Sequence, residues 1–166
     1  MLQPLLGRLT LLEAKEIEDI VHEHGAATHL RYGQTALARE CLRLVRGSSA
    51  VEQAAATSAV VFSKQSVHEL GAETLRLASA DAAGGVQSFT MDHAAVAADT
   101  VDKIAAAAGL CQSVSEARRQ IKAGGLYVNG KRVTSSASRL HKDELVDGCA
   151  FVLRSGKKKH VVVFVD

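Results

Sequence analysis

The sequence predicts an α+β fold, in which a helical first part is followed by two short helices packed on a small, mainly antiparallel sheet. Capping sequences followed by apolar residues at helical spacing fill the first half of the chain. Runs of β-branched and aromatic residues around Gly-containing turns dominate its end. Aromatic residues make up only 4% of the 166 positions and Trp is absent, so the core must be built from Ala, Leu, Val and Ile.

Capping sequences mark where most helices of the first part are expected to begin. Residues 10–13 read TLLE, in which the Thr hydroxyl can accept a hydrogen bond from the third helical amide while the Glu reaches back. Similar boxes stand at residues 49–52 and 66–69. A further helix is expected over residues 34–46, with an apolar stripe and Gly47 as its terminator.

The stretch over residues 80–99 has a different character. Its beginning lies in the run ASADAAGGVQSF at residues 78–89, which has two adjacent glycines, many small residues and little periodicity. Such a composition is typical of a linker or mobile loop. We therefore expect a helical segment at 1–79, a linker at 80–99 and a separately folding domain at 100–166.

Two helices and a hairpin are expected in the last part of the chain. A short helix should follow a cap at Thr100, and a second should occupy residues 113–123. The run LYVNGKRV predicts a β-hairpin, because Asn129-Gly130 is the strongest short hairpin turn signal. Two more strands should lie on either side of Gly156.

Charge is distributed unevenly along the chain. The net charge is +2, but residues 1–98 carry −3 and residues 99–166 carry +5. Residues 118–159 contain 11 basic and 3 acidic side chains. A basic block in an otherwise neutral chain is typical of a protein that binds nucleic acid or an anionic surface, although ordinary solvated lysines give the same count.

Several other classes of protein are disfavoured by what the sequence contains. Cys41, Cys111 and Cys149 are far apart and form no C-x-x-C pair, so neither a zinc knuckle nor a disulfide framework is indicated. His22 and His24 would point about 200° apart on a helix and would not chelate one ion. No apolar run approaches the length of a membrane span. We find no nucleophile–base pair and expect neither enzymatic activity from this chain alone nor a cofactor.

The expected helix at 113–123 carries the main candidate site. Val114, Ala117 and Ile121 form an apolar stripe that should pack inward. Three cations occupy its outer side, and the hairpin adds three polar or charged residues at or beyond its turn. Such a cluster could span neighbouring phosphates. These six residues are Arg118, Arg119, Lys122, Asn129, Lys131 and Arg132.

The order of these residues resembles a known RNA-binding family. The run SVSEARRQIKAGGLYVNGKRV is similar to the alpha-L module, also called the S4-like domain, which packs two short helices against a small sheet and binds structured RNA. The resemblance covers residues 101–166. Within that family, the closing SGKKK run and the upstream YGQTALARECLRLVRG resemble bacterial-type tyrosyl-tRNA synthetases, with Arg46-Gly47 in place of the usual His-Gly. Overall divergence points to a mitochondrial member, for example a fungal one.

The resemblance implies a function and adds residues to the site. It implies that the chain holds tRNA-Tyr by the anticodon stem and long variable arm, while the catalytic domain of a homodimeric parent aminoacylates it. The parent would reside in the mitochondrial matrix, or alternatively in the cytoplasm, with no membrane partner. The alternatives are a surface that folds group I intron RNA for splicing and a ribosome-associated protein. The candidate RNA-binding residues are Ser115, Arg118, Arg119, Lys122, Asn129, Lys131, Arg132, Lys157, Lys158 and Lys159.

One expectation concerns the helix at 113–123 directly. Because Arg118, Arg119 and Lys122 should project from the outer side of this helix, reversing their three charges is expected to nearly abolish RNA binding and to leave the fold intact. Arg118 borders the apolar stripe, so its reversal is expected to cost more stability than the other two.

Overall fold

The computed structural model describes residues 2–62, 66–80, 85–156 and 159–166. The chain divides into two compact units, residues 1–52 (unit 1) and residues 53–166 (unit 2). Within the described ranges, no helix is both long and apolar enough to cross a membrane.

Unit 1 is helical, as the sequence predicts. Its second helix begins at a capping box formed by Glu13 and Glu16, one turn later than the expected box at Thr10. The Thr10 hydroxyl instead donates to the Leu6 carbonyl at 2.6 Å, at the end of the first helix. Leu6 is completely buried and Ile17 nearly so. The elements are α1 (Leu2–Leu9), α2 (Ala14–Ala26), the 3₁₀ turn η1 (Thr28–Leu30) and α3 (Tyr32–Arg46).

A helix connects the two units, and unit 2 is built on a five-stranded sheet. Helix α4 (Ser48–Phe62) carries the chain from unit 1 into unit 2. The sheet has the order β1-β5-β4-β2-β3, in which only the β1–β5 pair is parallel. This arrangement confirms the predicted α+β class with a mainly antiparallel sheet. The strands are β1 (Gln87–Met91), β2 (Leu126–Val128), β3 (Lys131–Arg132), β4 (Ala150–Ser155) and β5 (Lys159–Val165).

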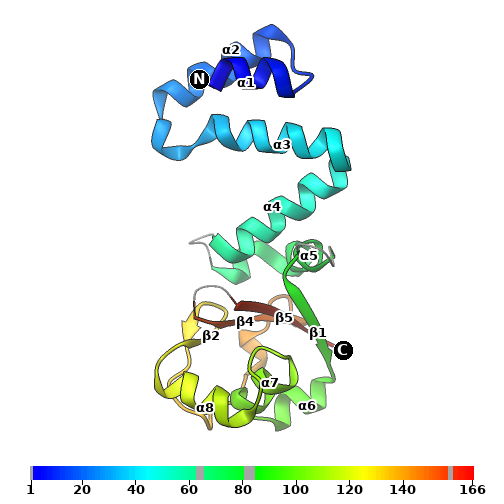
Figure 1. Ribbon diagram of the computed structural model, residues 1–166. Coiled ribbons are helices and arrows are strands. Elements are labelled where there is room, and N and C mark those ends of the chain that lie inside the picture. Colours follow the sequence, from blue (N-terminus) through cyan, green and yellow to red (C-terminus); the bar gives the residue numbers. More distant parts are fainter. Residues whose placement is uncertain (1, 63–65, 81–84, 157–158) are drawn as a thin grey trace. The chain divides into compact units, whose positions relative to one another are not determined.

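Helices cover both faces of this sheet (Figure 1). Alternate side chains of a strand point to opposite faces, so Phe151 and Leu153 pack in one core while Val152 packs in the other. The first core is closed by the helices that follow β1, and the second by α4 and the helix after it. These helices are α5 (Val67–Ser79), α6 (His93–Ala98), α7 (Val101–Ala107) and α8 (Val114–Lys122).

The stretch expected to be a linker at 80–99 differs from that expectation. Its described part contains strand β1 and helix α6, and Val86 and Val96 are buried. Strand β1 forms because it pairs with β5, the last strand of the chain. Local composition carries no signal for such a distant partner. Residues 81–84, which include the first of the two adjacent glycines, lie outside the described residues.

The boundary between compact units also differs from the expected one. It falls after Glu52 rather than within residues 80–99. The later part of α4 contributes Ala56 and Val60 to the second core of unit 2, and α5 contributes Leu75 and Ala78. Residues 53–79 therefore belong with the sheet, because their apolar side chains cover its second face.

Candidate nucleic-acid interface

Helix α8 presents polar side chains on one side and anchors itself by the other. Ser113 caps the helix, since its hydroxyl accepts a hydrogen bond from the Glu116 amide at 3.2 Å. Ala117 and Ile121 are buried, which confirms that the predicted stripe packs inward, with Val114 half-buried. The exposed residues of this helix are Ser115, Arg118, Arg119 and Lys122. The solvent-facing side of α8 therefore carries three cations and one hydroxyl group.

Arg118 is held by a carboxylate from the neighbouring helix α7. Its Nε donates to Oδ2 of Asp102 at 2.7 Å, and the side chain of Asp102 is only 1% exposed whereas that of Arg118 is 57% exposed. The other oxygen, Oδ1, accepts from the Thr100 hydroxyl and from the Lys103 amide. Burial raises the pKa of Asp102, but the hydrogen bonds from Thr100, Arg118 and the Lys103 amide outweigh it and hold the pKa below its ordinary value.

This ion pair affects how much stability a charge reversal at Arg118 should cost. The pair gives a physical reason for the larger stability cost that is expected at Arg118 than at Arg119 and Lys122. A glutamate in place of Arg118 would face the buried charge of Asp102. The cost should be on the order of 2 kcal/mol, below that of a fully buried pair because Arg118 is more than half exposed.

Asn129 lies inside the hairpin rather than on its surface. It is 8% exposed and adopts a positive φ of 47°. Its Oδ1 accepts from the Val152 amide at 2.8 Å, and its Nδ2 donates to the Glu144 carbonyl. The sequence-based placement of Asn129 among the RNA-binding residues is therefore not supported by its position. The side-chain amide of Asn129 hydrogen-bonds to the backbone of Val152 in β4 and of Glu144, and it is buried.

Arg132 lies against the end of α8. Its Nε donates to the Gly124 carbonyl at 2.9 Å, next to the carbonyl end of that helix where a cation is favoured. Gly124 has a φ of +70°, and a Cβ there would lie 1.7 Å from a guanidinium nitrogen of Arg132. The backbone conformation thus favours glycine, and a side chain at this position would displace the Arg132 guanidinium.

Cations from two elements meet in a shallow hollow beside Gly124. The hollow has a volume of about 200 Å³ and is lined by Lys122 at the end of α8 and by Arg132 on β3, together with Val133 and Thr134. Lys131 is exposed on the same short strand. The structure therefore brings together one predicted cation of the helix, Lys122, and one of the hairpin, Arg132.

A second hollow next to β3 contains basic residues that the sequence analysis did not single out. It has a volume of about 310 Å³, and its lining includes Lys131, Arg132, Arg139 and His141. Arg139 is exposed in a loop without helical or strand periodicity, so no pattern marked it. The only signal in the sequence was the excess of basic residues over 118–159, which already counts Arg139.

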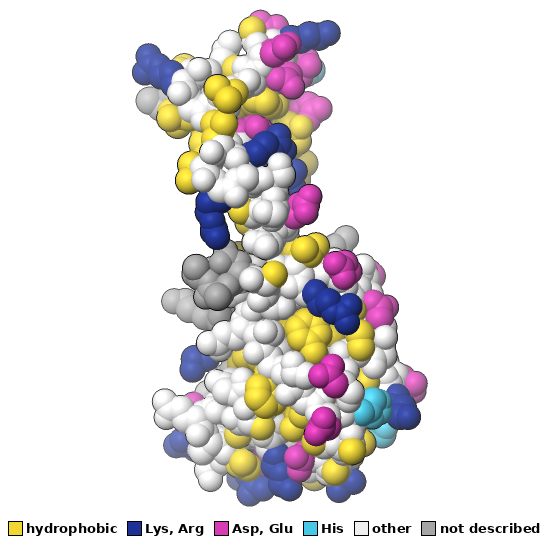
Figure 2. All heavy atoms as spheres, turned by 90° about the vertical axis from the view of Figure 1, so that its right-hand side faces the viewer, with side chains coloured by type: hydrophobic (Ala, Val, Ile, Leu, Met, Phe, Trp, Pro, Cys, Tyr) yellow, Lys and Arg dark blue, Asp and Glu magenta, His cyan; other side chains and the backbone are white. Residues whose placement is uncertain are grey.

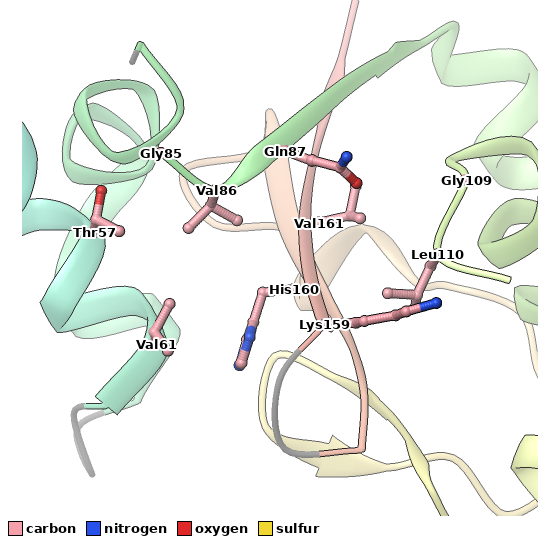
Figure 3. A pocket seen from close by; sticks show the side chains of 10 residues that line it. All are labelled: Thr57, Val61, Gly85, Val86, Gln87, Gly109, Leu110, Lys159, His160 and Val161. Atoms are coloured by element: carbon pink, nitrogen blue, oxygen red, sulfur yellow. The ribbon is translucent and has the colours of Figure 1, made fainter. Parts of the chain in front are cut away.

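Lys159 occupies a different part of unit 2. It is the first residue of β5, which is separated from β3 by the two strands β4 and β2 in the sheet order. Its side chain extends toward Leu110 in the loop between α7 and α8, along a cavity of about 500 Å³ (Figure 3). Lys157 and Lys158 lie outside the described residues.

Unit 2 also carries cations at the end formed by α6, α7 and α8. Lys and Arg side chains gather along its lower end in Figure 2, the end at which Figure 1 shows α6, α7 and α8. We call the exposed cations of α8 and β3 the basic face, which consists of Arg118, Arg119, Lys122, Lys131 and Arg132.

Comparisons with known proteins agree with this geometry. The S4 domain family matches residues 100–146, which include α7, α8 and the hairpin. The tyrosine–tRNA ligase of Lactococcus lactis subsp. cremoris (strain SK11) is 32% identical over 160 residues, covering 96% of this chain and 36% of the relative. The tyrosine–tRNA ligase of Streptococcus pyogenes serotype M49 (strain NZ131) is 33% identical over 155 residues, covering 93% and 35%.

The chain thus spans little more than a third of the length of these relatives, and it aligns with their C-terminal part. Residues 100–146 of this chain form an S4 domain, and nearly the whole chain is homologous to the C-terminal part of tyrosine–tRNA ligases.

Proposed function

We propose that this chain is the tRNA-binding region of a tyrosyl-tRNA synthetase. It holds tRNA-Tyr by the anticodon stem and the long variable arm, while a catalytic domain elsewhere in the parent enzyme attaches tyrosine. The observation that carries this proposal is the basic face. Within the matched S4 domain, Lys122 from α8 and Arg132 from β3 line one hollow beside Gly124.

The geometry of the basic face suits a phosphate backbone. Arg119 and Lys122 stand on a helix whose other side is anchored in the core, and Lys131 and Arg132 stand on a strand of the sheet. Arg can bind a phosphate through two nitrogens, whereas Lys acts as a point charge. Cations fixed on rigid elements read the path of a folded RNA rather than its base sequence, which is how structured RNA is commonly recognised.

Binding of tRNA is tested by fluorescence anisotropy with labelled tRNA-Tyr. The variant is Arg119→Gln combined with Lys122→Gln, because both side chains are exposed and, within the described ranges, neither side chain forms a hydrogen bond or an ion pair. We expect an affinity loss of about tenfold or more at low salt, since each lost phosphate contact removes counterion release.

A matched control is the substitution Arg76→Gln on α5, an exposed cation of the same unit on the helix that covers the other side of the sheet. It should leave the affinity unchanged. If the double variant binds tRNA-Tyr as tightly as the unaltered chain, the basic face is not the RNA site.

The finer details of the parent enzyme stay predictions. These are a homodimer formed through the catalytic domain and a location in the mitochondrial matrix or the cytoplasm. Group I intron RNA and ribosomal RNA would use the same basic face, so they serve as competitors in the titration. Displacement of tRNA-Tyr by intron RNA at equal or lower concentration would favour the splicing alternative.

A further inference from the structure

The buried carboxylate of Asp102 has a place in the candidate interface beyond balancing a charge. We infer that Asp102 is a positioning residue for RNA binding: it holds Arg118 by Nε and thereby aims the two terminal nitrogens of the guanidinium at an RNA phosphate. This inference rests on the proposed function, because it names how one cation of the basic face is made ready for its ligand.

The hydrogen bonds of the carboxylate leave it one orientation. Oδ1 is occupied by the Thr100 hydroxyl and the Lys103 amide, and Oδ2 accepts from Arg118 Nε at 2.7 Å. The side chain is 1% exposed, between the completely buried Ile104 and the nearly buried Val101 on the same helix. The carboxylate of Asp102 is therefore fixed in place, and the Arg118 side chain adopts the conformation that reaches it.

The ion pair uses only part of the guanidinium. Among the described residues, the hydrogen bond from Nε is the only one that the Arg118 side chain makes, and more than half of this side chain is exposed. A carboxylate that only paired with an arginine would commonly engage two of its nitrogens in parallel. Here the contact through Nε leaves both terminal nitrogens of the guanidinium for a second acceptor. These two nitrogens can donate in parallel to two oxygens of one phosphate.

The position of Arg118 on α8 places this fork within the basic face. Residues four apart on a helix are neighbours on one side, so Arg118 lies beside Lys122, which lines the hollow shared with Arg132. An arginine that is already held loses less side-chain freedom when the phosphate arrives. Asp102 thus prepares Arg118 before the RNA binds.

The substitution Asp102→Asn separates positioning from charge. It removes one negative charge next to the basic face, so electrostatics alone would make RNA binding tighter. If Asp102 instead positions Arg118, the variant should bind tRNA-Tyr more weakly, by about threefold to tenfold, because the arginine must be ordered at the time of binding. Affinity is measured well below the melting temperature of each variant, which circular dichroism provides.

Arg118→Lys gives a second measurement that does not depend on removing the buried carboxylate. Lysine retains a cation for Asp102 but lacks the fork. We expect a weaker affinity with an unchanged dependence on salt, since the number of neutralised charges stays the same. Combining Asp102→Asn with Arg118→Gln should weaken binding no more than Arg118→Gln alone, because both act through one side chain.

The outcomes distinguish this inference from the proposed function. Equal or tighter binding by folded Asp102→Asn, or unchanged binding by Arg118→Lys, would overturn the positioning role. If Arg119→Gln with Lys122→Gln still weakens binding by about tenfold or more in the same assay, only the inference fails. If that double variant also binds normally, the proposed RNA site fails as well.

Discussion

At the scale of single residues, Asp102 carries a charge that is almost completely removed from solvent. Its pKa lies below the ordinary value, because hydrogen bonds from Thr100, Arg118 and the Lys103 amide outweigh the effect of burial, which by itself raises the pKa. A lowered pKa means that the folded protein binds a proton at this site less readily than the unfolded chain does. Asp102 therefore contributes stability at neutral pH.

This contribution should disappear as the pH falls. We expect the free energy of unfolding of the unaltered chain to decrease below about pH 5, where an ordinary Asp begins to protonate, and to continue falling toward the lower pKa of the folded state. Urea unfolding at a series of pH values between neutral and pH 3 measures this. The Asp102→Asn variant should lack this part of the pH dependence. If the free energy of unfolding depends on pH in the same way in both proteins, Asp102 does not contribute stability in the way described.

Gly124 and Gly130 offer a second comparison between single residues. Both have a positive φ, +70° and +81°, so alanine at either position should cost about 1 kcal/mol of stability from backbone strain. Only at Gly124 would the new Cβ collide with the Arg132 guanidinium, whereas at Gly130 it meets no atom within 4 Å. Gly124→Ala should therefore also displace Arg132.

RNA titrations beside thermal melts separate the two effects. Gly124→Ala is expected to lower the affinity for tRNA-Tyr severalfold, and Gly130→Ala is expected to leave it unchanged at similar stability. Equal affinities of the two folded variants would show that the placement of Arg132 over Gly124 has no role in binding.

At the scale of elements, the sheet of unit 2 depends on segments outside the S4 match. Strand β1 pairs along its whole length with β5, from Gln87 opposite Val161 to Met91 opposite Val165. Helices α4 and α5 cover the face on which Val152 and Val162 are buried. Residues 100–166 alone would expose that face together with an unpaired edge of β5, which favours aggregation.

This dependence predicts how fragments behave. A fragment of residues 53–166 should unfold cooperatively, whereas residues 100–166 should be poorly soluble or only partly folded. Thermal melts followed by circular dichroism, with size-exclusion chromatography, compare them. A cooperative transition of the shorter fragment at the temperature of the longer one would contradict the packing described for β1, α4 and α5.

At the scale of the whole molecule, charge is concentrated in the second part of the chain. Residues 118–159 carry 11 basic and 3 acidic side chains, whereas residues 1–98 are net acidic. If four to six phosphates are neutralised, the affinity for structured RNA should fall by about two orders of magnitude or more between roughly 50 and 200 mM salt. Anisotropy titrations at several salt concentrations measure this slope, and a flat response would contradict electrostatic binding.

Local signals accounted for the elements that are stabilised locally. The Ser113 cap, the buried Ala117 and Ile121, and the turn at Asn129-Gly130 all lie where spacing and turn chemistry predict them. The same signals could not tell that Asn129 is buried, because its partner Val152 is far away in the sequence. They also could not distinguish the paired Arg118 from its neighbour Arg119.

By itself, the sequence determined the α+β class, the apolar side of α8, the hairpin turn and the excess of positive charge. Each of these depends on residues within a few positions of one another. Only the tertiary structure decided that β1 belongs to the sheet, that α4 and α5 cover it, that Asp102 holds Arg118, and that Arg132 crosses Gly124. These features join segments distant in the chain, and their energies arise only when packing removes water and brings the partners together.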